Sequence, residues 1–98
     1  MLQRIVKMTF QPERIEDFLT VFAESSPHIR ARQGCRYLEL WRAHEPDNVI
    51  FTYSHWDSAE DLDAYRHSDL FRTTWAKTKV LFADRPAAWS VNTLEQLP

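Results

Sequence analysis

The amino-acid sequence predicts an α+β fold with the element order β-α-β-β-α-β. Three observations predict the first part of this order: an alternation of apolar and polar residues over 2–10, an apolar helical stripe over 15–22, and two more alternating segments at 35–43 and 49–56. A second helical region and a last alternating segment, 88–97, complete the order. It is the order of the ferredoxin-like split βαβ unit, in which helices cover an antiparallel sheet. We therefore expect a single α+β domain over residues 1–98.

The first strand is expected over Leu2–Phe10, and the first helix follows it. Pro12 suits the opening turn of a helix, where its missing N–H would have no partner in any case. The helix carries one apolar stripe, which consists of Ile15, Phe18, Leu19 and Phe22. Ser25-Ser26-Pro27 interrupts that stripe, so we expect a helix that is kinked or in two parts. Gly34, the only glycine, follows where a left-handed residue ends a helix.

Two further strands, Cys35–Ala43 and Val49–Trp56, are joined by the turn-forming residues HEPDN. Ser58 stands three positions before an acidic residue, which is typical of a helix N-terminus and predicts a short helix after the third strand. Ser68 is expected to cap a second helix in this region, and Pro86 ends it. The fourth strand then occupies the last alternating segment.

Composition and charge exclude several classes of protein. The chain has 12 basic and 14 acidic residues, with no basic run mixed with aromatic residues, so we expect no nucleic-acid partner. Its single cysteine, Cys35, excludes an internal disulfide and a multi-cysteine zinc site, and its ordinary role is that of a small, half-buried strand residue. No segment has the pattern of a membrane span or a signal peptide. We expect a cytoplasmic protein that has no membrane partner.

The predicted sheet carries large residues on both faces. One face of the first two strands is apolar, and its residues are Val6, Met8, Phe10, Leu38 and Leu40. The opposite face is mixed and carries Ile5, Lys7, Thr9, Tyr37, Glu39 and Trp41. A face meant only for water would not hold so many rings. We therefore predict a homodimer that buries this face, in which Glu39 would either form a salt bridge or have a pKa raised by burial.

Four segments carry a family resemblance: RIVKMTFQPERIEDFL, GCRYLEL, FTYSHWDSAEDLDAYRHSDLFRTTW and AAWSVNTL. Through them the chain resembles the antibiotic biosynthesis monooxygenase (ABM) family over nearly its whole length. The most diagnostic stretch is the aromatic strand that ends at Trp56, followed by Ser58 and by Tyr65-Arg66-x-Ser68-x-x-Phe71. The resemblance implies a dimeric α+β barrel of ferredoxin-like subunits. It also implies an activity, because family members include cofactor-independent oxygenases that turn phenols or hydroquinones into quinones.

One branch of this family degrades haem, and the resemblance argues against that activity here. That branch has a tryptophan and then a histidine on the second helical region, and an asparagine on the first strand. The corresponding residues of this chain are Tyr65, Trp75 and Val6. An indole cannot coordinate iron, whereas a proximal haem site needs a neutral imidazole. We therefore expect no haem and no other cofactor.

A quinone-forming oxygenase without metal or flavin has three physical needs. It must bind an electron-rich ring in an apolar slot, hold a general base whose pKa is near the working pH, and donate hydrogen bonds to the oxyanion. Trp56 matches the tryptophan that ends a strand in the family, and it is expected to form part of the slot. The expected ligand is a small aromatic molecule.

His55 is the candidate catalytic residue, and Tyr53 is expected in the same pocket. His55 shares one strand face with Phe51 and Tyr53 and stands beside Trp56. We expect it to be a base or hydrogen-bond donor at the mouth of the cavity; the alternative is an exposed histidine at a strand end. The four histidines have none of the spacings that bind metals, so no metal site is expected.

Tyr65, Phe71 and Trp75 are the other ring-bearing candidates for the pocket. Phe71 and Trp75 are four residues apart and share a helix face. That spacing is the ordinary pattern of a core stripe, but residues of such a stripe also line a slot when one lies between helices and sheet. Arg66 and Arg72 have two interpretations: they donate to an anion, or they lay their stems on the rings and keep their charge in water.

Three hypotheses follow from these residues. The first is a small oxygenase acting on an aromatic substrate. The second is a non-catalytic ligand-binding or sensing dimer of the same fold, which a small aromatic would stabilise without being consumed. The third is an assembly unit with a filled core, in which Phe71 and Trp75 leave no space against the sheet. The volume between helices and sheet separates the third hypothesis from the others.

Overall fold

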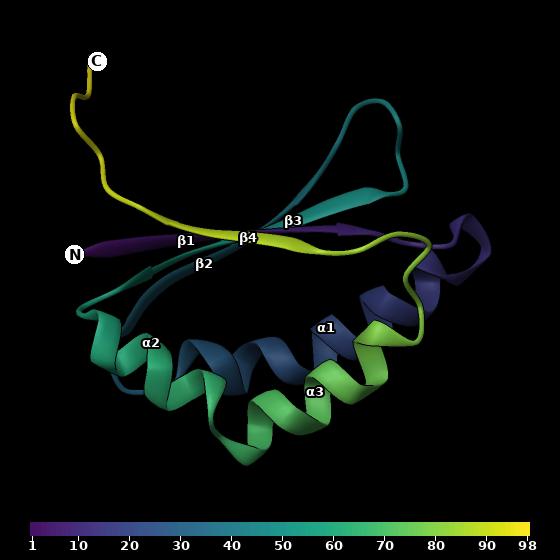
Figure 1. Cartoon of the computed structure of the whole chain (residues 1–98), viewed down its shortest axis with the longest axis horizontal. Helices are drawn as coiled ribbons and strands as arrows, with labels where there is room; N and C mark the ends of the chain where they lie inside the picture. The colour runs from purple at the N-terminus through teal and green to yellow at the C-terminus, as the bar shows by residue number, and fades with distance from the viewer.

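The computed structural model describes residues 1–98 and contains a four-stranded antiparallel sheet with all of its helices on one face (Figure 1). The elements are β1 (Leu2–Thr9), the short 3-10 helix η1 (Pro12–Arg14), α1 (Ile15–Arg30), β2 (Cys35–Arg42), β3 (Val49–Trp56), α2 (Ala59–Arg66), α3 (Asp69–Lys79) and β4 (Ala87–Val91). The strands lie in the order β2-β3-β1-β4. The predicted βαββαβ order and the ferredoxin-like fold are therefore confirmed.

The first helix is continuous over Ile15–Arg30, so of the two predicted alternatives, a kinked helix or a two-part helix, the two-part helix is wrong. Pro27 lies inside α1, where it can donate no backbone hydrogen bond. The helix nevertheless continues for three more residues, because Ile29 in the last turn is buried against the core. The Ala31 N–H donates to the carbonyl oxygen of Pro27 at 3.1 Å and completes that turn. Burial of one apolar side chain offsets the loss of one hydrogen bond.

The two serine caps of the second helical region are confirmed. Ser58 precedes α2, and its Oγ accepts a hydrogen bond from the Asp61 N–H at 3.1 Å. Ser68 precedes α3, and its Oγ accepts from the Phe71 N–H at 3.1 Å. Each cap satisfies a backbone donor that the first turn of a helix leaves free. The Ser68 cap fixes where α3 begins and therefore which of its residues face the sheet.

None of the helices is both long and apolar enough to cross a lipid bilayer.

Two groups of buried apolar residues lie between the helices and the sheet. The larger group consists of Met8, Phe10, Ile15, Phe18, Ile50 and Leu81. The smaller group consists of Cys35, Trp56 and Leu62. Cys35 is a strand residue, as predicted, but it is fully buried rather than half-buried. The fourth strand is shorter than predicted, because only residues 87–91 pair with β1. After Val91 the Thr93 hydroxyl still donates to the Gln3 Oε1 at 2.9 Å, and the last residues then turn away from the sheet (Figure 1).

Gly34 has the positive φ that the sequence predicted, +85°, but its place differs from the expected one. The first helix ends at Arg30, with Ala31 as its right-handed C-cap residue. Gly34 therefore belongs to the turn that leads into β2. Its carbonyl oxygen accepts a hydrogen bond from the Asp57 N–H at 2.9 Å, so this turn also holds the end of β3.

Replacing Gly34 by alanine is expected to lower the free energy of unfolding. The left-handed backbone alone costs an L-residue about 1–2 kcal/mol, and the new Cβ would also meet the side chain of Asp61. Urea unfolding of Gly34→Ala, Asp61→Gly and the double variant separates the two causes, because glycine at position 61 removes both the carboxylate and the Cβ that the new methyl group would meet. The double variant should recover the steric part only, since the Asp61 N–H that Ser58 caps remains. A Gly34→Ala protein with the wild-type midpoint would contradict this account.

Candidate functional site

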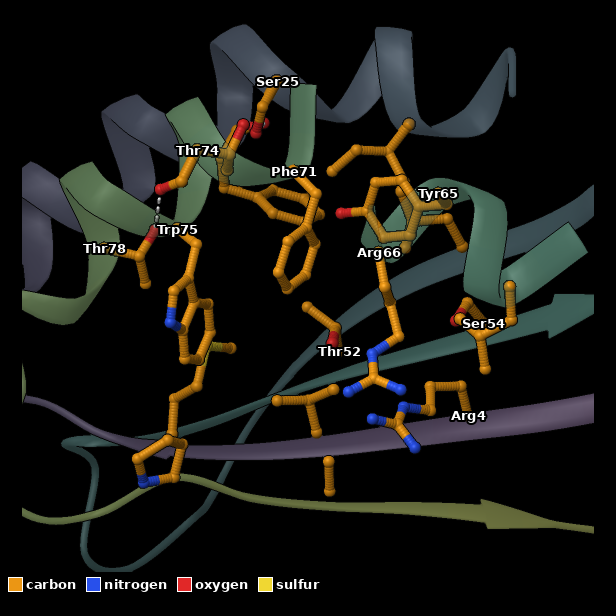
Figure 2. Close-up of a pocket in the computed structure, with 18 of the residues that line it drawn as sticks. Arg4, Ser25, Thr52, Ser54, Tyr65, Arg66, Phe71, Thr74, Trp75 and Thr78 are labelled. Atoms are coloured by element: carbon orange, nitrogen blue, oxygen red, sulfur yellow. Dashed lines mark hydrogen bonds between the residues drawn. The ribbon is translucent and has the colours of Figure 1, made fainter. Parts of the chain in front are cut away.

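A cavity of about 360 Å³ lies between the helices and the inner face of the sheet. That volume is within the range of sites that bind small molecules, roughly 300–1,000 Å³. It contradicts the hypothesis of a filled core. The cavity is lined by Arg4, Val6, Met8, Phe18, Phe22, Ser25, Ile29, Leu38, Thr52, Ser54, Trp56, Leu62, Tyr65, Arg66, Phe71, Thr74, Trp75, Thr78, Pro86, Ala87 and Ala88. Figure 2 shows the labelled side chains that extend from the helices and from the sheet toward this space.

Aromatic rings form one wall of the cavity. Trp56 and Tyr65 are stacked with ring centroids 5.2 Å apart, and Phe71 meets the Tyr65 ring edge-on at 5.3 Å. Phe71 and Trp75 then lie nearly parallel, with 5.8 Å between their centroids. The structure thus brings together four of the residues that the sequence proposed for a pocket. They come from β3, α2 and α3, so the wall depends on how the second helical region packs against the sheet.

Tyr65 places a hydroxyl group in this apolar wall. Figure 2 shows its oxygen directed toward the interior of the cavity. Burial raises the pKa of Tyr65 to about 12, with a further increase from Cys35 and a smaller opposing effect of Arg32. At neutral pH the hydroxyl is therefore protonated. It can donate a hydrogen bond to an anionic oxygen of a bound molecule, but it cannot act as a base.

Tyr65 is expected to make the protein less stable as the pH rises from about 10 to about 12. In the unfolded chain a tyrosine ionises near pH 10, whereas the folded chain holds the Tyr65 proton until about pH 12. The folded state binds more protons in this window, so the free energy of unfolding falls, by about 2–3 kcal/mol in total. Urea unfolding at several pH values should show a larger loss in the wild type than in Tyr65→Phe, which keeps Tyr37 and its raised pKa. Equal pH dependence of the two proteins would contradict the raised pKa of Tyr65.

Two arginines, Arg4 from β1 and Arg66 from α2, supply the charge of the cavity. Figure 2 shows their guanidinium groups beside one another at one end of the labelled residues. Burial lowers the pKa of Arg4, and the neighbouring positive charge of Arg66 lowers it further, while Asp63 has the opposite effect. The wall contains no aspartate, glutamate or histidine. The site therefore presents positive charge and hydroxyl groups, but no residue that accepts a proton near neutral pH.

Arg4 is the charged site residue that was not predicted from the sequence. It lies on the same strand face as Val6 and Met8, because side chains two positions apart point the same way. A charged residue on an otherwise apolar strand face was the signal that could have identified it. Arg66 was weighed as a donor to an anion, and it does line the cavity.

Three predicted pocket residues lie elsewhere. His55 and Tyr53 are on the outer face of the sheet, so His55 is not at the mouth of the cavity as expected. The reason is the alternation of β3: Trp56 and Ser54 line the cavity, and their neighbours in the chain point the opposite way. Arg72 lies outside the wall, where it donates to the carbonyl oxygen of His67 at 2.8 Å and pairs with Asp69.

His55 and Tyr53 belong to an aromatic cluster on the outer face of the sheet, which consists of Tyr37, Glu39, Trp41, Tyr53 and His55. The rings of Trp41 and Tyr53 are stacked at 4.7 Å, and those of Tyr37 and His55 are 4.9 Å apart. The hydroxyl of Tyr53 lies 2.8 Å from the His55 Nε2. Glu39 accepts hydrogen bonds from Tyr37 and from the Trp41 Nε1–H, which together lower its pKa. The predicted rise in the pKa of Glu39 applies to a carboxylate buried by a partner subunit, whereas in the single chain these hydrogen bonds lower it.

The chain is similar to a known protein family and to a curated protein. The family model described as "Antibiotic biosynthesis monooxygenase" matches residues 1–77. A curated protein of Haloarcula marismortui, named "Putative heme-binding protein rrnAC3100", is 35% identical over 78 residues. That match covers 80% of this chain but 12% of the longer protein.

Solved structures share the fold at low sequence identity. A crystal structure of an antibiotic biosynthesis monooxygenase aligns with a TM-score of 0.90 and 16% identity, and covers 97% of this chain and 100% of the other. Rv0793 of Mycobacterium tuberculosis has a TM-score of 0.88 at 18% identity, with 99% and 98% of the two chains covered. A Caulobacter crescentus structure with the same kind of description has a TM-score of 0.89 at 19% identity, covering 96% and 90%.

Proposed function

This chain belongs to the antibiotic biosynthesis monooxygenase family, and we propose that it is a cofactor-independent monooxygenase that oxidises a small phenol or hydroquinone to a quinone. The observation that supports the proposal is the cavity, in which an aromatic wall meets a protonated hydroxyl and two guanidinium groups. The rings of Trp56, Phe71 and Trp75 suit a flat aromatic substrate. The charged end suits the anion that forms when such a substrate loses its hydroxyl proton.

The stoichiometry of the proposed reaction accounts for both oxygen atoms of O₂. A phenol and one O₂ give a quinone and one water, and a hydroquinone and one O₂ give a hydroxyquinone and one water. In each case one oxygen atom enters the ring and the other leaves as water with two hydrogens of the substrate. The phenolate must first form, because the anion gives an electron to O₂ more readily than the neutral phenol. Tyr65 donates a hydrogen bond to the phenolate oxygen, and the positive charges of Arg4 and Arg66 lower the free energy of the anion. The substrate proton passes to water, since the wall holds no carboxylate or imidazole.

The residues of the cavity do not fit a haem group, although one relative's name refers to haem. Haem iron in proteins is held by histidine, cysteine, methionine or tyrosine. No histidine or cysteine lines the cavity, and Met8 is packed within the larger apolar group. Tyr65 would have to lose its proton to bind iron, which its raised pKa opposes. We therefore assign no step to haem.

A ligand-binding or sensing dimer without catalysis is the second candidate. The observation that favours it is the lack of a general base in the cavity wall. It predicts that a small aromatic molecule raises the melting temperature and is recovered unchanged. In either case we propose that the functional unit is a homodimer that buries the outer aromatic cluster.

The test of the proposed function is oxygen uptake together with quinone absorbance, measured with a panel of phenols and hydroquinones. We expect both signals to exceed those of protein-free solutions for at least one compound in air, and quinone formation to stop under anaerobic conditions. Tyr65→Phe should lower kcat about 100-fold, as loss of an oxyanion donor does elsewhere. Tyr53→Phe removes a hydroxyl from the opposite face and should cost much less. Rates equal to the protein-free rates throughout the panel would refute the oxygenase proposal.

A further inference from the structure

The positions of Arg4 and Arg66 indicate which charged group a ligand of the cavity has. These side chains come from different layers, one from β1 in the sheet and one from α2 above it. Figure 2 shows their guanidinium groups next to each other, and the effect of Arg66 on the pKa of Arg4 agrees with that proximity. Like charges repel, and the nearby Asp63 carboxylate offsets only one of the two positive charges, so a bound anion would lower the free energy of this arrangement.

The two guanidinium groups have unused hydrogen-bond donors. An arginine has about five N–H donors in a planar fork. Arg4 uses one of them, from Nη1 to the Ser90 Oγ at 3.1 Å. The Nη1 of Arg66 lies 3.8 Å from the Asp63 Oδ1, which is too long for a hydrogen bond. Most donors of the pair therefore remain available to a bound molecule.

The net charge around the two arginines favours one kind of anion over another. Asp63 is the one carboxylate near the pair, and it contributes one negative charge against two positive ones. The remaining charge is a single positive one, which matches a monoanion better than a doubly charged phosphate. A carboxylate has the planar, two-oxygen shape that a guanidinium binds through parallel hydrogen bonds.

The apolar part of the cavity indicates which chemical group carries the carboxylate. Beyond the arginines the wall consists mainly of apolar and aromatic side chains, among them Trp56, Phe71 and Trp75. A molecule that fills this space has an aromatic ring at the apolar end and its charged group at the arginine end. We propose that the ligand of this cavity is a small aromatic acid whose carboxylate binds between Arg4 and Arg66. The inference rests on the proposed function, because it takes the phenol or hydroquinone ring from there.

Binding of matched acids and amides tests this inference without any oxidation. The probes are 2,5-dihydroxybenzoate and 4-hydroxybenzoate, each compared with its neutral amide, under anaerobic conditions in a calorimeter. The amide has the same shape and lacks the charge. We expect the acids to bind at least about tenfold more tightly than their amides at low salt, with the difference shrinking as salt is added.

Substitutions of the two arginines test whether they cause the preference for acids over amides. Arg4→Gln and Arg66→Gln should each remove most of the tenfold difference, and the double variant should remove all of it. Arg14→Gln also removes one positive charge, but from the start of the first helix, and should keep the full difference. Circular dichroism and the melting temperature check that each variant is folded. Equal binding of acid and amide by the wild type, no binding of either acid, or a preference that survives in the double variant would overturn the inference.

The outcomes also separate this inference from the proposed function. Tight binding of the acids, together with protein-free rates of oxygen uptake for every compound of the panel, would support the carboxylate site and refute the oxygenase. Oxidation of neutral hydroquinones without a preference for acids would support the oxygenase and refute the carboxylate site.

Discussion

Replacing Trp56 by alanine is expected to lower the free energy of unfolding by about 3–5 kcal/mol. Trp56 is 1% exposed and belongs to the buried group with Cys35 and Leu62. Its indole is stacked on Tyr65, and its Nε1–H donates to the Ser54 Oγ at 3.0 Å. Alanine would remove the ring contacts, leave the serine oxygen without its donor and open a void beside an existing cavity. Small domains are stable by about 5–15 kcal/mol, so this one change removes a large part of the total.

Urea unfolding followed by circular dichroism measures the effect of Trp56→Ala. Val80→Ala is the matched control, because Val80 is 62% exposed at the end of the third helix and should change stability by less than about 0.5 kcal/mol. Trp56→Phe separates the ring from the hydrogen bond: it keeps much of the packing and should cost about 1–2 kcal/mol. A Trp56→Ala protein that unfolds at the control's midpoint would show that this ring does not hold the wall together.

Much of the fold was predictable because its signals are local. Period-two alternation identified β1, β2 and β3 to within about one residue of their observed bounds. Ser58 and Ser68 identified the helix starts, because a serine at that position satisfies a free backbone donor. The continuity of α1 through Pro27 was not predictable, since it depends on Ile29 reaching a core that the local sequence does not describe.

The candidate site was predictable only in part, because a strand pattern separates two faces without saying which one the helices cover. Trp56, Tyr65, Phe71 and Trp75 were expected in a pocket, and all four line the cavity. His55 was assigned to that pocket as the neighbour of Trp56 in the chain. Neighbours on a strand point in opposite directions, and this places His55 on the outer face.

In our proposals the inner face of the sheet forms the ligand cavity and the outer face forms the dimer interface. The inner face, together with the helices, encloses the cavity. The outer face has no helix over it (Figure 1), yet it carries large rings, with Tyr37 40%, Trp41 39% and Trp89 49% exposed. Such a surface is typical of a protein interface rather than of a face in contact with water. Its one carboxylate, Glu39, already accepts two hydrogen bonds, so a second copy could bury it at low cost.

Replacing Trp41 by glutamate is expected to convert the proposed homodimer into monomers. In a two-fold interface each substitution acts twice, and loss of a central tryptophan costs about 2 kcal/mol or more per copy. The sum of about 4 kcal/mol corresponds to a roughly thousandfold weaker dimer. The new carboxylates would add repulsion, because each lies beside Glu39.

Sedimentation velocity over a range of protein concentrations measures this change. The wild type should sediment as a dimer at micromolar concentration, and Trp41→Glu as a folded monomer. Val80→Glu makes the same kind of substitution, from apolar to acidic, at the helix side of the molecule and should remain dimeric. A wild-type protein that is monomeric at all concentrations would contradict the dimer, because its outer rings would then be stable in water without a partner. The cavity would be unaffected by that result, since all of its lining residues come from one chain.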